Sequence, residues 1–184
     1  RTTVCGEDLA KELGVSLCAL RTLGVGWSGS HCAWMWPMRN GKNEVVGWNR
    51  RFKDGTKKIL AGTKAGLYIP QMDASNPAFV CEGGSDTAAL LDMGFFAIGR
   101  FNVSSGAADL KEFFRLNQIF RCVIVADNDS LKNYGGTKAR PGIIGAQRLK
   151  SDLGVSSCIW IPPTPCKDVR DFVKRGGTKE LIES

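Results

Sequence analysis

The chain has 184 residues, 43% hydrophobic and 9% aromatic, so it can bury a core and is not a disordered chain. Its net charge is +7, and no apolar run approaches the roughly 20 residues of a membrane span. We therefore expect one domain or two small ones in the cytoplasm, with no membrane partner. Because the chain starts at Arg1 rather than Met, we also expect it to be a piece of a longer protein.

Residues 8–24 show a helical pattern, in which Gly14 ends a first helix and Ser16 caps a second one. From residue 32 the pattern changes to alternation. It predicts strands at 32–38, 44–52 and 57–60, joined by turns at 40–43 and 53–56. We expect these strands to form an antiparallel meander within a small α+β subdomain that covers residues 1–76. The tryptophans of this subdomain favour a core role over base stacking.

Basic residues concentrate on this meander, against only two acids, Glu44 and Asp54. The cluster suggests a polyanionic partner, although a solvated lysine-rich face would have the same composition. The basic residues of the cluster are Arg39, Lys42, Arg50, Arg51, Lys53, Lys57, Lys58 and Lys64.

Residues 77–184 alternate between strands and helices. We predict strands at 78–82, 95–99, 121–126 and 157–161, and helices at 85–93, 107–117, 142–153 and 169–175. Continuous apolar strands alternating with helices are typical of a parallel sheet in an α/β domain. The longest irregular stretch, residues 130–141, carries Lys132 and Lys138 and is interpreted as a mobile, basic flap.

Acidic residues follow the predicted strands at their carboxyl ends. Glu82 ends the first strand and Asp86 lies one helical turn later, while Asp127 and Asp129 follow the third strand and Asp168 follows the fourth. Open α/β sheets bind ligands at this edge, and carboxylates suit a divalent cation. We therefore expect these acids to converge on a metal site.

The same acids could also have purely structural roles. Asp127 and Asp129 could be turn residues, Glu82 could pair with an arginine, and Asp168 or Asp171 could cap the last helix. Similarly, residues 104–106 could offer backbone N–H groups to a phosphate, but capping of the following helix is favoured.

The chain contains seven cysteines but no CxxC pair. This spacing disfavours a zinc ribbon or a disulfide framework and favours reduced thiols in the core of a cytosolic protein. The adjacent pair His31 and Cys32 lacks partners for a metal shell, so no zinc site is expected. The cysteines are Cys5, Cys18, Cys32, Cys81, Cys122, Cys158 and Cys166.

The acidic pattern resembles the TOPRIM (topoisomerase–primase) domain: Glu-Gly-x-x-Asp after a strand, Asp-x-Asp after a later strand and Lys-Asp after the next, over residues 77–175. Segments 36–41, 46–51, 57–60 and 64–68 follow the order of the basic subdomain that precedes TOPRIM in DnaG-type primases. Residues 168–170 depart from the Asp-Pro-Asp of many bacterial replicative primases, and the pattern is more similar to phage or plasmid primases.

The resemblance implies a Rossmann-like TOPRIM domain preceded by the basic subdomain. It also implies the RNA-polymerase core of a DNA primase, which makes short RNA primers from NTPs on single-stranded DNA with Mg²⁺ or Mn²⁺. The implied catalytic and metal residues are Glu82, Asp127 and Asp129, supported by Asp86 and Asp168. The implied phosphate-binding residues are Arg50, Arg51, Lys58 and Lys64, to which the flap adds Lys132 and Lys138.

No zinc module or helicase-binding segment is seen in the sequence, so a replicative helicase would be contacted through domains outside this chain. Two other classes remain open. A TOPRIM nuclease or topoisomerase fragment would keep the acids, but a topoisomerase needs a nucleophilic tyrosine, and the two tyrosines are Tyr68 and Tyr134. A non-catalytic DNA-binding TOPRIM module would have no reason to keep mutually repelling carboxylates.

Overall fold

The structure is a computed structural model that describes residues 6–134 and 137–183. It opens with two short helices, α1 (Gly6–Leu13) and α2 (Leu17–Thr22). As predicted, Gly14 adopts a positive φ of 70°, and the Ser16 side chain accepts a hydrogen bond from the Ala19 N–H at 3.0 Å. The helices bury Leu9, Leu13 and other apolar residues and leave their charged residues outside.

The predicted antiparallel meander is present as β2 (Ala33–Arg39), β3 (Val45–Arg51) and β4 (Lys57–Ile59). A short strand that the pattern did not predict, β1 (Gly26–Ser28), pairs with the start of β2. Trp34 and Trp36 are 7% and 4% exposed, so they belong to the core as expected.

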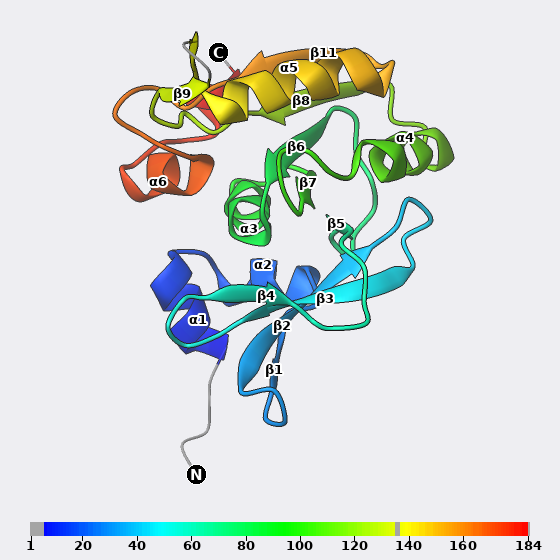
Figure 1. Ribbon diagram of the computed structural model, residues 1–184, viewed down its shortest axis with the longest axis vertical. Helices are drawn as coiled ribbons and strands as arrows, with labels where there is room; N and C mark the ends of the chain where they lie inside the picture. Colours follow the sequence, from blue (N-terminus) through cyan, green and yellow to red (C-terminus); the bar gives the residue numbers. More distant parts are fainter. Residues whose placement is uncertain (1–5, 135–136, 184) are drawn as a thin grey trace.

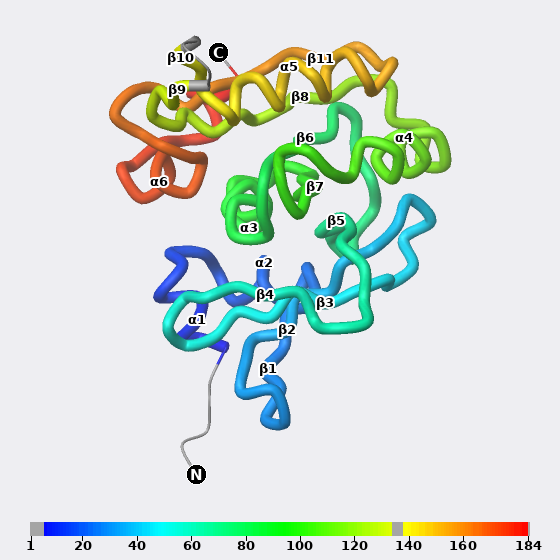
Figure 2. The backbone as a smooth tube through the Cα atoms, viewed as in Figure 1, coloured from blue at the N-terminus to red at the C-terminus, as the bar shows by residue number. Residues whose placement is uncertain are grey.

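A second unpredicted strand, β5 (Leu67–Tyr68), connects the two halves of the protein. Leu67 pairs with Arg39 of β2 on one side and with Arg100 of β7 (Ala97–Arg100) on the other. Figure 2 follows the backbone from β4 up to this strand. The meander and the second half therefore share one sheet, and the division at residue 76 remains a prediction.

The second half contributes four parallel strands: β6 (Ala78–Glu82), β7, β8 (Arg121–Val125) and β11 (Ser156–Trp160). The strand order across the sheet is β11-β8-β6-β7-β5-β2-β3-β4. The predicted α/β class and parallel sheet are confirmed. Because the parallel strands all end at one edge, the residues that follow β6, β8 and β11 are brought to the same side.

Helices cover both faces of the parallel part of the sheet (Figure 1). On one face, α3 (Gly84–Asp92) and α6 (Val169–Lys174) pack with α1 and α2 against inward residues such as Phe79 and Cys81. On the other face, α4 (Ala107–Leu116) and α5 (Pro141–Leu153) cover Val80 and Ile98. Helix α7 (Glu180–Glu183) is the last element. No helix in the described part of the chain could cross a membrane.

Two expectations need correction. The stretch at 130–141 is not irregular throughout, because β9 (Lys132–Tyr134) and β10 (Thr137–Ala139) pair as a hairpin whose residues 135–136 lie outside the described residues. Residues 104–106 do supply the N-cap of α4, but it is Gly106 in the left-handed region, which forms no side-chain capping bond.

The second correction concerns the cysteines. The six in the described part of the chain are free thiols, but three of them are exposed rather than in the core: Cys18, Cys32 and Cys158. Cys32 also lies in the turn before β2, with a positive φ of 46°, instead of in the strand. Cys5 lies outside the described residues.

Candidate metal and phosphate site

Two glycines shape the turn that follows Glu82 at the end of β6. Gly83 has φ 81° and ψ 153°, a combination that essentially only glycine adopts. At Gly84 a Cβ atom would come within 2.5 Å of the Trp36 ring, so only glycine lets α3 approach β2 this closely. The turn lets α3 begin directly after β6 and leaves Glu82 half-buried at the end of the strand.

Asp86, in the first turn of α3, is 9% exposed. Its Oδ1 atom accepts a hydrogen bond from the Arg170 backbone N–H at 3.2 Å. The pKa of Asp86 is raised to about 6 by burial and by the Asp168 carboxylate, and Arg170 opposes this rise. Asp86 thus ties α6 to α3, a supporting position beside the other acids.

Asp127 and Asp129 leave the end of β8 on either side of Asn128. The Asn128 Nδ2 atom donates to the carbonyls of Pro162 and Cys166, both at 3.2 Å, and its backbone N–H donates to the Lys167 carbonyl at 2.7 Å. Its Oδ1 atom accepts from Arg140 Nη1 at the start of α5. Asn128 therefore holds together the three segments that carry the edge, a role the sequence pattern did not reveal.

The capping alternative for Asp168 is confirmed. Asp168 is the N-cap of α6, and its Oδ1 atom accepts from the Asp171 N–H at 2.7 Å. Asp171 in turn accepts from the Lys167 N–H at 3.1 Å and pairs with Arg175 at 2.9 Å. Asp168 remains half-buried and close enough to raise the pKa values of Asp86 and Asp127, so capping and a place at the acidic edge coexist.

Asp127 is the electrostatic centre of the edge. Burial and then the carboxylates of Asp86, Glu82, Asp168 and Asp129 raise its pKa to about 8. The pKa of Glu82 is also raised, by burial and by Asp129, although Arg100, Lys167 and Lys57 act against the rise. The acids predicted from three separate segments thus act on one another, and the ionised forms of Asp86, Asp127 and Glu82 are destabilised by burial and by neighbouring carboxylates.

The donor set at this edge suits a hard divalent cation, because it consists of carboxylate oxygens whose repulsion a cation would relieve. In the described part of the chain, no group of three or more His, Cys, Asp or Glu side chains forms a metal-holding cluster. Mg²⁺ typically takes one or two carboxylates, with water and substrate phosphates completing its shell. The residues therefore fit a metal bound together with a phosphate substrate.

Lys57 is the residue of the basic cluster whose pKa the acids Asp86 and Asp168 affect. Register pairs Arg51 with Lys57 and Arg50 with Lys58, and paired residues of antiparallel strands share a face of the sheet. Arg51 and Lys57 line a small crevice against Gly84 and Ser85 of α3. Desolvation and Arg51 lower the pKa of Lys57, whereas Asp86 and Asp168 act to raise it.

The other predicted basic residues are spread over several surfaces. Arg51 Nη2 forms an ion pair with Glu12 Oε1 at 2.5 Å, and Arg50 lies over the Phe52 ring at 5.5 Å. The remaining four are exposed: Lys58, Lys64, Lys132 and Lys138. Which of them bind phosphate remains a prediction.

Four basic residues near the acids were missed as candidate site residues: Lys57, Arg100, Lys167 and Arg170. Lys57 belonged to the basic cluster, but a three-residue strand does not reveal which of two adjacent lysines lies on the face of the sheet that carries Arg51. Arg100 ends β7 and is cross-strand to Glu82. Lys167 and Arg170 flank Asp168 in sequence, a signal that could have pointed to them.

Comparison with solved structures places this fold among primase catalytic cores. The primase fragment of the bacteriophage T7 primase-helicase protein aligns over 94% of this chain and 71% of its own, with 16% identity and a TM-score of 0.64. The E. coli primase catalytic core aligns over 97% and 71%, with 16% identity and a TM-score of 0.69. A DnaG primase catalytic domain bound to single-stranded DNA aligns over 97% and 69%, with 16% identity and a TM-score of 0.71. No family model and no curated protein matches the sequence.

Proposed function

We propose that this chain is the catalytic core of a DNA primase, which makes short RNA primers from NTPs on single-stranded DNA. The observation that carries the proposal is the convergence of acids from β6, β8 and β11 on one sheet edge, opposite Lys57 of the meander, within a primase-core fold. Acids that raise the pKa of Asp127 to about 8 are costly unless they hold a cation, which supports a metal-dependent activity.

In this proposal Glu82, Asp127 and Asp129 hold Mg²⁺ or Mn²⁺, and Asp86 and Asp168 support them. Divalent metal, when bound, supplies activation of the attacking 3′-hydroxyl and neutralisation of the leaving pyrophosphate. The contribution of this chain is positioning and charge. Lys57, Lys167 and Arg170 surround the acids and would orient phosphate groups, and exposed lysines would hold the template backbone.

The test is synthesis of oligoribonucleotides from NTPs on single-stranded DNA, with Mg²⁺ or Mn²⁺. Glu82→Gln keeps the size of the side chain but removes its charge, so we expect product formation to fall by about 10²-fold or more. Asp73→Asn, in an exposed acid that precedes the amino end of β6, is the control and should leave synthesis unchanged. Equal activity of Glu82→Gln and wild type would contradict the proposal.

The same assay separates the other enzyme class. Cleavage of DNA without synthesis would indicate a TOPRIM nuclease, and binding without either reaction would indicate a non-catalytic module. The pairing of β5 with both β2 and β7 favours the primase over these alternatives, because it joins the basic meander to the acidic sheet in one unit that a nuclease does not need.

Lys57 and Lys58 are adjacent in β4 and lie on opposite faces of the sheet, so their variants test which face contributes to primer synthesis. We expect Lys57→Ala to lower synthesis by roughly 10-fold or more, because Lys57 is near enough to Asp86 and Asp168 for their charges to act on its ammonium group. Lys58→Ala removes an equal charge from the opposite face and should change synthesis less than about threefold. Rates at saturating NTP on one template, measured with both variants, provide the check, and a larger loss for Lys58→Ala would reverse the assignment.

The proposed partners and origin of the protein follow from the same function. The solved T7 neighbour is a fragment of a primase-helicase protein, so we propose a replicative helicase as partner through other domains, and a phage or plasmid origin. Binding to single-stranded DNA should weaken steeply with salt, because the contacts are expected to go to phosphates.

A further inference from the structure

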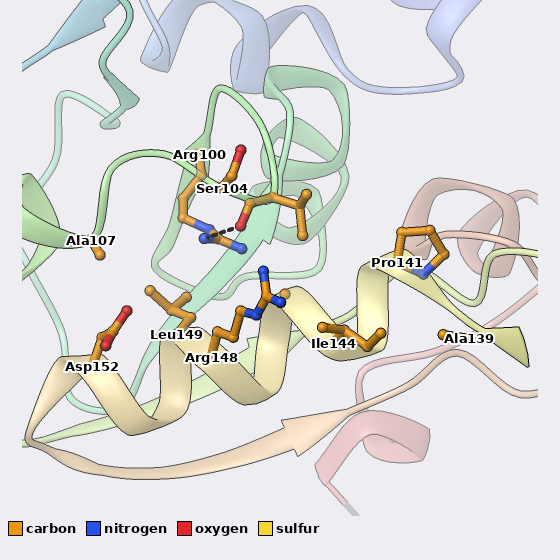
Figure 3. Close-up of a pocket in the computed structure, with 11 residues that line it drawn as sticks. Arg100, Ser104, Ala107, Ala139, Pro141, Ile144, Arg148, Leu149 and Asp152 are labelled. Carbon is orange, nitrogen blue, oxygen red and sulfur yellow. Dashed lines mark hydrogen bonds between the residues drawn. The ribbon is translucent and has the colours of Figure 1, made fainter. Parts of the chain in front are cut away.

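A cavity of about 520 Å³ lies between α5 and the loop that joins β7 to α4 (Figure 3). The five acids of the sheet edge are not among the residues that line it. The cavity is on the α4/α5 side of the sheet, whereas the crevice with Lys57 lies against α3. The lining residues with polar side chains are Arg100, Ser104, Arg148 and Asp152, and the apolar ones include Val103, Ile144 and Leu149.

Arg100 supplies a cation to this cavity: the Glu82 carboxylate of the neighbouring strand acts on its charge, but not all of its hydrogen-bond donors are used. Arg100 is 5% exposed, and its Nη1 atom donates to the Val103 carbonyl at 2.9 Å. Its Nε atom is buried without a hydrogen-bond partner in the described part of the chain. Figure 3 shows the guanidinium group extending into the space above α5, on the side of Arg148. A buried guanidinium with an unused donor is costly, and an anion in the cavity would complete its hydrogen bonds.

Two helix N-termini add positive potential. The N-cap residues Gly106 of α4 and Arg140 of α5 form no side-chain capping bond, and both helices begin at the cavity, with Ala107 and Pro141 among its lining residues. Backbone N–H groups of a helix without a side-chain cap bind phosphate well. Arg148 is exposed and reaches the same space from the third turn of α5.

The size and the mixed lining of the cavity indicate what would fill it. An inorganic phosphate would occupy a minor part of 520 Å³, while the stretch of α5 from Pro141 to Asp152 runs for about 16 Å along the wall. Ile144 and Leu149 offer an apolar wall to a planar group, and Asp152 offers an acceptor away from the α5 N-terminus. We propose that the cavity between α4 and α5, whose lining contains none of the five acids although α5 begins beside Asp127, is a nucleotide-binding site with the phosphates at Arg100 and Arg148.

This proposal is independent of primer synthesis, and it is tested by calorimetric titration of the whole chain with ATP in EDTA. Removal of divalent cations suppresses binding that depends on the acids. We expect saturable binding of ATP, and weaker binding of adenosine and of inorganic phosphate. Because Arg148 is exposed, Arg148→Ala should fold normally and weaken ATP binding by about 10-fold, while Arg148→Lys should keep part of the affinity.

Two further variants locate the binding. Ser104→Trp places a large ring at the exposed rim of the cavity and should abolish ATP binding. Arg115→Ala removes an exposed arginine of α4 that does not line the cavity and should have no effect. The proposal is overturned if ATP does not bind without metal, if inorganic phosphate binds as tightly as ATP, or if Arg115→Ala weakens binding as much as Arg148→Ala does.

Discussion

Asp127→Asn is expected to lower primer synthesis by on the order of 10²–10³-fold and, without divalent cation, to make the protein more stable at alkaline pH. Both effects have one cause. Asp127 is the acid on which burial and four other carboxylates act, and this raises its pKa to about 8. The negative charge of Asp127, which a cation would need, is therefore the charge that most destabilises the metal-free fold. Its removal should lower activity and raise stability.

The pH dependence follows from the direction of the shift. Since the folded-state pKa of Asp127 lies above the ordinary value of about 3.9, the folded protein binds this proton more tightly than the unfolded chain. Its stabilising contribution is complete below about pH 4 and is lost as pH rises towards 8. Asparagine stays neutral, so the melting temperature of the variant should exceed that of wild type by at least ~3 °C at pH 9 in EDTA, and the difference should shrink towards pH 4.

Thermal melts of wild type and Asp127→Asn in EDTA at several pH values measure this difference. Addition of Mg²⁺ should raise the melting temperature of wild type more than that of the variant, because a ligand bound only by the folded state stabilises it by mass action. A variant that is less stable than wild type at pH 9 would show that Asp127 is not electrostatically frustrated. Its pKa would then be close to ordinary.

The second large effect is expected from a residue that carries no functional group. Gly142 is buried in the first turn of α5, and a Cβ atom there would lie 2.5 Å from the Asp127 carbonyl oxygen and 3.0 Å from the Asp127 Cβ atom. Gly142→Ala must therefore displace the end of β8 or the start of α5. A displacement of about 1 Å at a catalytic group costs roughly 10²-fold in rate, and we expect a loss of synthesis of that order.

The stability change of Gly142→Ala should be smaller than its effect on rate. Overpacking costs about 1–3 kcal/mol, but alanine regains nearly 1 kcal/mol of helix propensity. Gly29→Ala is the control, since a Cβ atom at Gly29 meets nothing within 4 Å. Synthesis assays and denaturant unfolding of both variants check the prediction, and full activity in Gly142→Ala would show that the Asp127 segment adjusts without cost.

Local pattern was sufficient for most of the secondary structure. The four parallel strands and the four helices between and after them were placed to within two residues, because strand and helix periodicity, Ser16 as a cap and Gly14 as a helix end are properties of nearby residues. The elements that the sequence pattern did not predict were short. Strands β1, β5 and β9 have two or three residues, too few for periodicity to distinguish them from loops.

Sequence by itself determined the α/β class, the placement of Glu82, Asp127, Asp129 and Asp168 after strands, and the gathering of basic residues before them. These features depend on order along the chain, and parallel strands end at one edge whatever else the protein does. Only the tertiary structure decided which side chains meet. The face of β4 turned towards the acids selects Lys57 over Lys58, the β5 pairings join the two halves, and Asn128 links three separate segments. Strand register and packing set these relations between distant residues, and they leave no periodic signal in the sequence.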